Sequence, residues 1–137
     1  MKKVFVDTVA WIALLDRDDS LHSETVQIKE RLRRENAQLI TTDFIFLEVA
    51  DGFSNRRFRG RVAAYIDGVR RLAAFEVIPV SADLYEEGWR LYTQRPDTNW
   101  GLTDCISFVV MKRLSIETVF TSDRHFEQAG FVRLMKG

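Results

Sequence analysis

The chain has few of the features that mark secreted or membrane proteins. It holds a single cysteine, Cys105, so no disulfide can form within the chain. Its longest apolar run, residues 9–15, is far short of the roughly 20 residues needed to cross a bilayer. Lysine and arginine number 20, as do aspartate and glutamate, so no net charge attracts nucleic acid or a membrane surface. We therefore expect a cytoplasmic protein without a membrane segment, which would recognise any anionic partner through a local patch.

The sequence predicts an α/β fold. Hydrophobic residues at 46% and charged residues at 29% are typical of a globular chain, and residues 1–137 are expected to form a single domain. Short β-branched and aromatic runs alternate with segments of helical periodicity, which favours a central, mostly parallel sheet of four to five strands flanked by helices. The strands are expected at 4–6, 39–42, 75–80, 118–122 and 132–135, and the helices at 9–15, 21–35, 44–53, 60–71, 81–95, 105–111 and 124–129.

The sequence also predicts the caps of two helices and the buried face of a third. We expect Asp43 to cap the helix at 44–53, and Thr103 to cap the helix that follows it, with Asp104 in the first turn. The helix at 81–95 is expected to bury one side that is rich in large residues: Leu84, Tyr85, Gly88, Trp89, Leu91 and Tyr92.

Four acids stand in largely apolar surroundings near the ends of elements. Asp7 and Asp123 each follow a strand, Asp104 begins a buried helix, and Glu48 lies one turn into another helix. Ligands and chemistry gather at the carboxyl edge of parallel sheets, and an unpaired buried carboxylate is costly. These observations favour convergence of the four acids in one partly closed cleft. Separate helix caps and ion pairs are the alternative.

Converging carboxylates would repel one another unless a cation offset their charge. Oxygen ligands without a cysteine or histidine cluster suit Mg²⁺ or Mn²⁺ better than Zn²⁺. Such ions can support hydrolysis of a phosphodiester bond.

In sequence order these segments resemble the PIN-domain ribonucleases, and most closely the VapC-type toxins of toxin–antitoxin pairs. The resemblance covers nearly the whole chain and rests on four motifs in matching order: Val4-Phe5-Val6-Asp7-Thr8, Leu47-Glu48-Val49, residues 100–108 around Thr103-Asp104, and Thr121-Ser122-Asp123-Arg124-His125-Phe126.

The resemblance implies a PIN-like fold and an endoribonuclease that depends on Mg²⁺ or Mn²⁺. It implies that four acids are catalytic and bind the metal: Asp7, Glu48, Asp104 and Asp123. Thr8 and Ser122 would be accessory polar groups. Many relatives carry an acid just before the tryptophan of the third motif. This chain has Asn99 there, with Asp97 two residues earlier, so a fifth acidic contribution is open.

Other features concern partners. Arg56, Arg57 and Arg59 surround an aromatic residue and could contact RNA, an acidic antitoxin segment or a dimer partner. A protein antitoxin and a homodimer are expected. His125 follows the last acid and is more often a packing or capping residue than a general base.

Three alternatives to a toxin nuclease are open. One is a housekeeping RNA-processing nuclease, and another is a non-catalytic PIN-like binding module, although such a module would usually have lost an acid. The third is an aspartyl-phosphate phosphatase or a receiver-like module. A phosphatase usually carries a second aspartate two positions after the first, where this chain has Val9, and a receiver needs an acidic pair at the end of the first strand.

Overall fold

The computed structural model describes residues 2–137 and contains one five-stranded sheet. All four pairings between its strands are parallel, and the strand order is β3-β2-β1-β4-β5. The strands are β1 (Lys3–Val6), β2 (Gln38–Thr42), β3 (Phe75–Ile78), β4 (Thr118–Phe120) and β5 (Val132–Arg133). The predicted parallel α/β fold is therefore confirmed, with β1 at the centre of the sheet.

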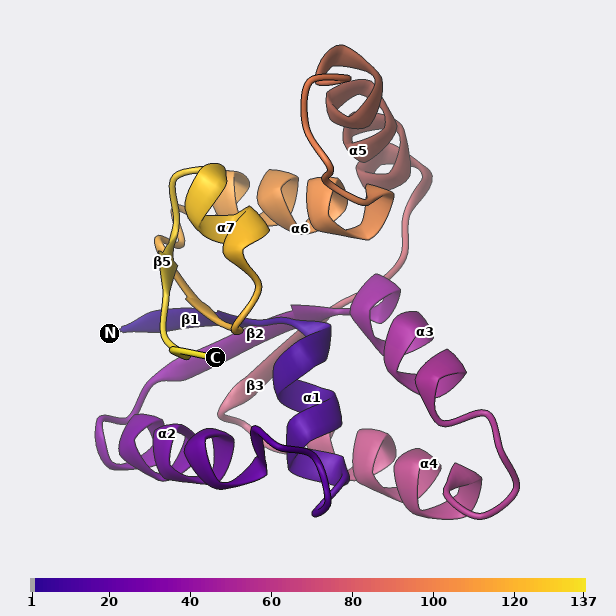
Figure 1. Cartoon of the computed structure of the whole chain (residues 1–137), viewed down its shortest axis with the longest axis vertical. Coiled ribbons are helices and arrows are strands. Elements are labelled where there is room, and N and C mark those ends of the chain that lie inside the picture. The colour runs from indigo at the N-terminus through magenta and orange to yellow at the C-terminus, as the bar shows by residue number, and fades with distance from the viewer. Residues whose placement is uncertain (1) are drawn as a thin grey trace.

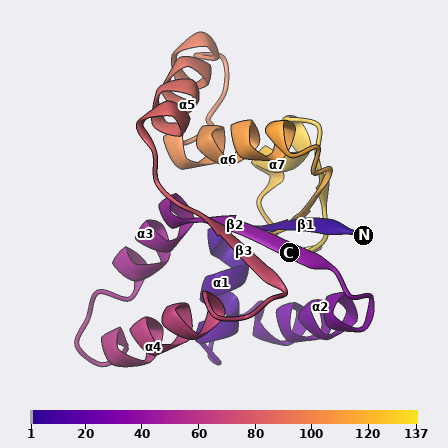
Figure 2. The same cartoon turned by 180° about the vertical axis from the view of Figure 1, so that it is seen from behind.

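The helices form a layer on each side of the sheet. Figure 1 shows α1 to α4 on one side and α6 and α7 on the other, and Figure 2 shows the same division from behind. Helix α5 packs against α6 and stands farther out from the sheet. The helices are α1 (Thr8–Leu15), α2 (His22–Arg34), α3 (Asp43–Gly52), α4 (Arg59–Val69), α5 (Ala82–Gln94), α6 (Leu102–Arg113) and α7 (Arg124–Gln128).

The central strand β1 lies in the hydrophobic core. Val4, Phe5 and Val6 are at most 1% exposed, as expected for a strand that is covered by helices on both faces. Trp11 of α1 is also buried, and its ring packs against Phe46 of α3 with the ring centroids 5.2 Å apart. The end of β1 is consequently enclosed by the core.

The prediction for the buried side of α5 is wrong in part. Leu84 and Gly88 are buried, but Tyr85 and Trp89 are each 48% exposed and Tyr92 is 42% exposed. The reason is that the main contact of α5 is with α6, and its aromatic residues lie outside that contact. The two helices meet at Gly88, where a Cβ atom would lie 2.3 Å from Cγ1 of Ile106.

Two predicted caps are shifted along the chain. Thr42, rather than Asp43, caps α3, because its Oγ1 accepts a hydrogen bond from the N–H of Ile45. Gly101, rather than Thr103, precedes α6, and Asp104 lies in the first turn as predicted. Among the helices of residues 2–137, not one has the length and apolar character required to span a membrane.

Candidate functional site

The predicted site lies where β1 and β4 end side by side. Val6 pairs with Phe120 in the parallel register, so the next residue of each strand, Asp7 and Thr121, also lie next to each other. The Thr121 hydroxyl donates a hydrogen bond to Oδ2 of Asp7 at 2.8 Å. Its Oγ1 also accepts a hydrogen bond from the N–H of Asp123 at 3.1 Å. Thr121 thus ties the carboxylate after β1 to the start of α7.

Asp7 is a buried carboxylate, only 4% exposed. Burial raises the pKa of Asp7 from 3.8 to about 7, against the opposing effect of the hydrogen bonds from Thr121 and the backbone of Thr8. The negative charges of Asp104 and Asp123 also act on Asp7 and raise this pKa further.

Asp104 reaches this environment from the first turn of α6. Its Oδ2 accepts a hydrogen bond from the N–H of Gly101 at 3.1 Å, which fixes the carboxylate at the helix start. Partial burial raises the pKa of Asp104, opposed by hydrogen bonds from His125 and Gly101, and the charge of Asp123 adds to the increase. A carboxylate held in this way is ready to accept a cation.

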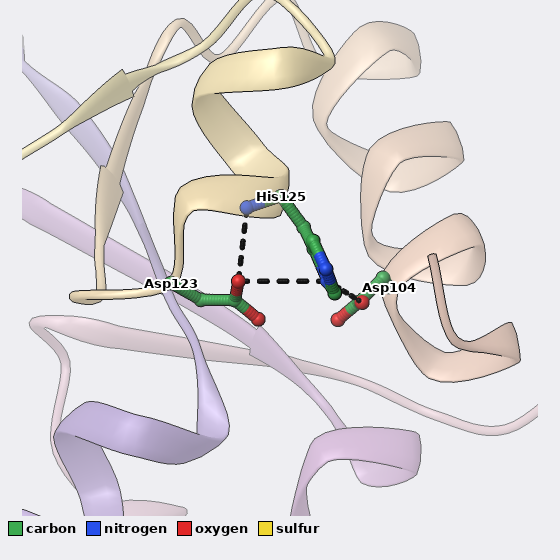
Figure 3. A group of neighbouring side chains, drawn as sticks. All are labelled: Asp104, Asp123 and His125. Carbon is green, nitrogen blue, oxygen red and sulfur yellow. Dashed lines mark hydrogen bonds and ion pairs between the residues drawn. The ribbon is translucent and has the colours of Figure 1, made fainter. Parts of the chain in front are cut away.

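Asp123 caps α7 and brings His125 into the same group. Oδ1 of Asp123 accepts a hydrogen bond from the backbone N–H of His125 at 2.9 Å. Figure 3 shows the imidazole ring reaching from α7 toward Asp104, with the Asp123 carboxylate beside it. Nδ1 of His125 lies 3.0 Å from Oδ2 of Asp104 and 3.5 Å from Oδ1 of Asp123.

The fourth predicted acid lies beside this group and is more exposed. Glu48 of α3 is joined to the Asp7 segment through the hydroxyl of Thr8, which donates to Oε1 of Glu48 at 2.5 Å. The predicted accessory residue Ser122 is partly buried, and its backbone carbonyl accepts a hydrogen bond from Arg133 at 2.8 Å. The structure therefore brings Asp104, Asp123 and His125 together, while Asp7 is joined to Asp123 through Thr121 and Glu48 lies on the exposed side.

Two residues of the site were missed or underrated in the sequence. The sequence places Thr121 only within a strand, although its hydroxyl contacts the first acid. It favours packing or capping for His125, although the ring contacts two acids. The register of β1 and β4 would have identified Thr121, but a register is not visible in one sequence. No local pattern indicates the direction of the His125 ring.

The group of side chains fits a divalent cation. One ligand atom from each of Asp104, Asp123 and His125 can be chosen so that all three lie within 4.8 Å of one another. The charge of nearby Asp7 would be stabilised by a cation in this position. The two carboxylates can supply hard oxygen donors to Mg²⁺ or Mn²⁺, and His125 adds a nitrogen that the sequence argument did not include.

The remaining predicted residues lie at the surface. Arg56 and Arg57 are exposed in the turn between α3 and α4, and Arg59 begins α4. Asp97 is exposed and forms an ion pair with Arg95 across 3.0 Å.

Comparison with known proteins identifies the family of the chain and its relatives. The PIN domain model matches residues 4–132. A 23S rRNA-specific endonuclease, VapC20 of Mycobacterium tuberculosis, is 29% identical over 131 residues, which are 96% of this chain and 97% of the relative.

Two solved structures of toxin–antitoxin proteins also match the fold of this chain. The crystal structure of M. tuberculosis VapC20, described as a sarcin-ricin loop cleaving toxin, matches with a TM-score of 0.78 and 28% identity over 94% of this chain and 96% of that one. VapBC2 from Rickettsia felis, bound to a DNA fragment from its promoter, matches with a TM-score of 0.70, covering 96% of this chain and 97% of that one. At 15% identity, the second match concerns the fold alone.

Proposed function

This chain belongs to the PIN-domain family, and on that premise we propose that it is a divalent-metal-dependent endoribonuclease. The observation that carries the proposal is the group of Asp104, Asp123 and His125 at the carboxyl edge of the sheet, to which Thr121 joins Asp7. The proposed catalytic and metal-binding set is completed by Glu48. Repulsion within this set disfavours the metal-free state in which all members are ionised, and a cation relieves it.

The chain holds each of these carboxylates by one oxygen. The hydrogen-bond donors are the Thr121 hydroxyl for Asp7, the Thr8 hydroxyl for Glu48, the Gly101 N–H for Asp104 and the His125 N–H for Asp123. Donors of this kind orient a ligand without contributing charge, so the acids are positioned before any cation arrives. When bound, Mg²⁺ or Mn²⁺ would supply activation of the attacking water and stabilisation of the charge that develops on the phosphate. Ser122, next to Thr121, is proposed as an accessory polar group.

The proposed substrate is RNA, and the large ribosomal RNA is the first to test. The support is the 29% identity, over nearly all of both chains, to a relative named as a 23S rRNA-specific endonuclease. We also propose that the protein acts in the cytoplasm as a VapC-type toxin.

A protein antitoxin is the proposed inhibitor, and the turn between α3 and α4 is its proposed contact. Arg56 and Arg57 are exposed there, beside a groove of about 360 Å³ lined by apolar residues such as Val62 and Ile66, with Arg59. An acidic, partly apolar segment would suit both the groove and the arginines. Replacing Arg56 and Arg57 by glutamate should weaken binding of the cognate antitoxin without changing RNA cleavage. Unchanged antitoxin affinity would place the contact elsewhere.

A homodimer is also proposed, formed through the exposed face of α5. Tyr85, Trp89 and Tyr92 form an aromatic row on this helix, and the rings of the last two stack with centroids 5.6 Å apart. Glu86 and Arg90 are exposed on the same helix, so two antiparallel copies of α5 could pair opposite charges around the aromatic contact. Light scattering should show a dimer that Trp89→Glu converts to a monomer. A monomeric wild-type protein at roughly tens of micromolar would contradict the proposal.

Cleavage of ribosomal RNA in the presence of Mg²⁺, Mn²⁺ or EDTA tests the proposed activity. The expected result is discrete cleavage with either metal and none with EDTA. Binding of RNA without cleavage in either metal would favour a non-catalytic PIN-like module instead. Broad cleavage of many RNAs would favour a housekeeping nuclease.

A further inference from the structure

We infer that His125 is a direct ligand of the divalent ion through Nδ1, and that this nitrogen makes the site prefer Mn²⁺ to Mg²⁺. The inference rests on the proposed metal-dependent function and deepens it. It assigns a metal-binding role to a residue that otherwise reads as part of a helix cap.

The position of the imidazole is the first support. Nδ1 of His125 lies 3.0 Å from Oδ2 of Asp104. Two ligands that sit at adjacent corners of an octahedral site, each about 2.1 Å from the ion, are about 3.0 Å from each other. The separation between these two protein atoms, which is that of a hydrogen bond in the ion-free chain, is thus also compatible with two neighbouring ligands of one ion. Oδ1 of Asp123 lies 3.5 Å from the same nitrogen, on another side of it (Figure 3).

The fixed backbone is the second support. The N–H of His125 donates to Oδ1 of Asp123, and the imidazole then turns back toward Asp104, so the first residues of α7 direct both side chains to one point. The ring is 30% exposed, which leaves the group accessible to an ion from solvent.

Charge is the third support. Asp104 and Asp123 already place two carboxylates beside Nδ1, and Thr121 joins Asp7 to Asp123. A further carboxylate would add repulsion, but a neutral imidazole adds a donor atom at no cost in charge. Glu48 is more exposed and accepts the hydrogen bond of Thr8, so His125 lies closer to the group of aspartates than the fourth acid does.

A nitrogen ligand changes the expected metal. Mg²⁺ binds oxygen ligands and keeps several waters, whereas transition-metal dications accept imidazole more readily. The acids alone would suit either Mg²⁺ or Mn²⁺. A set of carboxylate oxygens together with the His125 nitrogen favours Mn²⁺.

Pulsed electron paramagnetic resonance of Mn²⁺ bound to the full chain tests the inference. Direct coordination should give a ¹⁴N modulation of the Mn²⁺ echo that is lost in His125→Ala and retained in His22→Gln. His22 is the matched control because it is the other of the two histidines, and its Nδ1 contacts the carbonyl of Ala13 at 2.6 Å. If the alanine variant does not fold, His125→Asn keeps a polar side chain and should lose the same signal.

Titration calorimetry supplies the second readout. His125→Ala should weaken Mn²⁺ binding by about tenfold or more. It should change Mg²⁺ binding by less than about threefold, because Mg²⁺ readily replaces a protein ligand by water. Bound Mn²⁺ without ¹⁴N coupling, or with equal coupling in the His125 variant, would overturn the role of His125 and leave the acidic metal site standing. Absence of any Mn²⁺ or Mg²⁺ binding would overturn both this inference and the proposed metal dependence.

Discussion

Replacing Asp7 by asparagine should stabilise the metal-free protein while abolishing its activity. Asp7 is buried, and its pKa in the folded protein is raised from 3.8 to about 7. The folded state therefore holds this proton more tightly than the unfolded chain does. Stability from this group is present below pH 3.8, declines as the pH rises, and is lost above about 7. Above that pH the folded protein carries a buried charge that the unfolded chain accommodates in water.

The size of the effect follows from the shift. A change of about three pKa units corresponds to about 4 kcal/mol of free energy of unfolding at pH 8. Asparagine avoids this cost and can still accept the hydrogen bond from Thr121, but its amide group brings N–H donors that cost about 1–3 kcal/mol if one lacks a partner. The Asp7→Asn variant should thus be more stable than the wild type by about 1–3 kcal/mol at pH 8 in EDTA.

Urea unfolding between pH 4 and pH 8 in EDTA measures this difference. The advantage of Asp7→Asn should grow by up to about 1.4 kcal/mol per pH unit until pH 7 and then level off. Asp67→Asn is the matched control, because Asp67 is exposed on α4 and away from the site, and its curve should follow the wild type. A difference that does not vary with pH, or a destabilised Asp7→Asn protein at pH 8, would refute the reasoning.

The metal should reverse the order of the two proteins. A cation present at about 100 times its dissociation constant adds about 2.7 kcal/mol to the wild type. Asp7→Asn should lose most of this gain, because a hard cation has lost one of its anionic ligands. An equal gain in both proteins would remove Asp7 from the metal site.

Two further substitutions test the supporting structure by urea unfolding. Thr121→Val should cost about 1–3 kcal/mol, because it leaves the N–H of Asp123 without its acceptor. Thr118→Val, at the start of β4, is the control, and an equal loss of stability in both variants would show that the Thr121 hydroxyl does not have this role. Gly88→Ala should cost about 1–3 kcal/mol, because the new methyl group overlaps α6. Gly68→Ala is the control, because a Cβ atom at Gly68 would meet nothing within 4 Å, and it should stabilise α4 by about 0.5–1 kcal/mol. The same effect in both alanine variants would contradict the close approach of α5 and α6 at Gly88.

The sequence predicted the sheet well because its signals are local. A short apolar strand such as 4–6 is distinctive when it is buried on both faces, and an acid directly after it lies at the carboxyl edge in any parallel sheet. The placement of Asp7 and Asp123 after their strands follows from this rule. Asp104 lies in the first helical turn as predicted, although Gly101 and not Thr103 precedes the helix. Its carboxylate accepts a hydrogen bond from the N–H of Gly101.

The errors came from interactions between distant segments. Helical periodicity groups Trp89 and Tyr92 on a face of α5, but periodicity does not reveal whether another element covers that face. The choice between Thr121 and its neighbour Ser122 depends on the side of the strand from which each side chain leaves, and hence on the register with β1. The contact between His125 and Asp104 joins residues 21 positions apart and has no local signature.

Single-turnover cleavage of the proposed ribosomal RNA substrate is the most direct test of the central claim. It should be measured with saturating Mn²⁺ for the wild type, Asp7→Asn and the Asp67→Asn control, with all three shown to be folded. The account predicts that the wild type and the control cleave at the same rate, that Asp7→Asn is slower by about a hundredfold or more, and that EDTA stops the reaction. Cleavage by Asp7→Asn at the wild-type rate, or undiminished cleavage in EDTA, would contradict a metal-dependent site built on this acid.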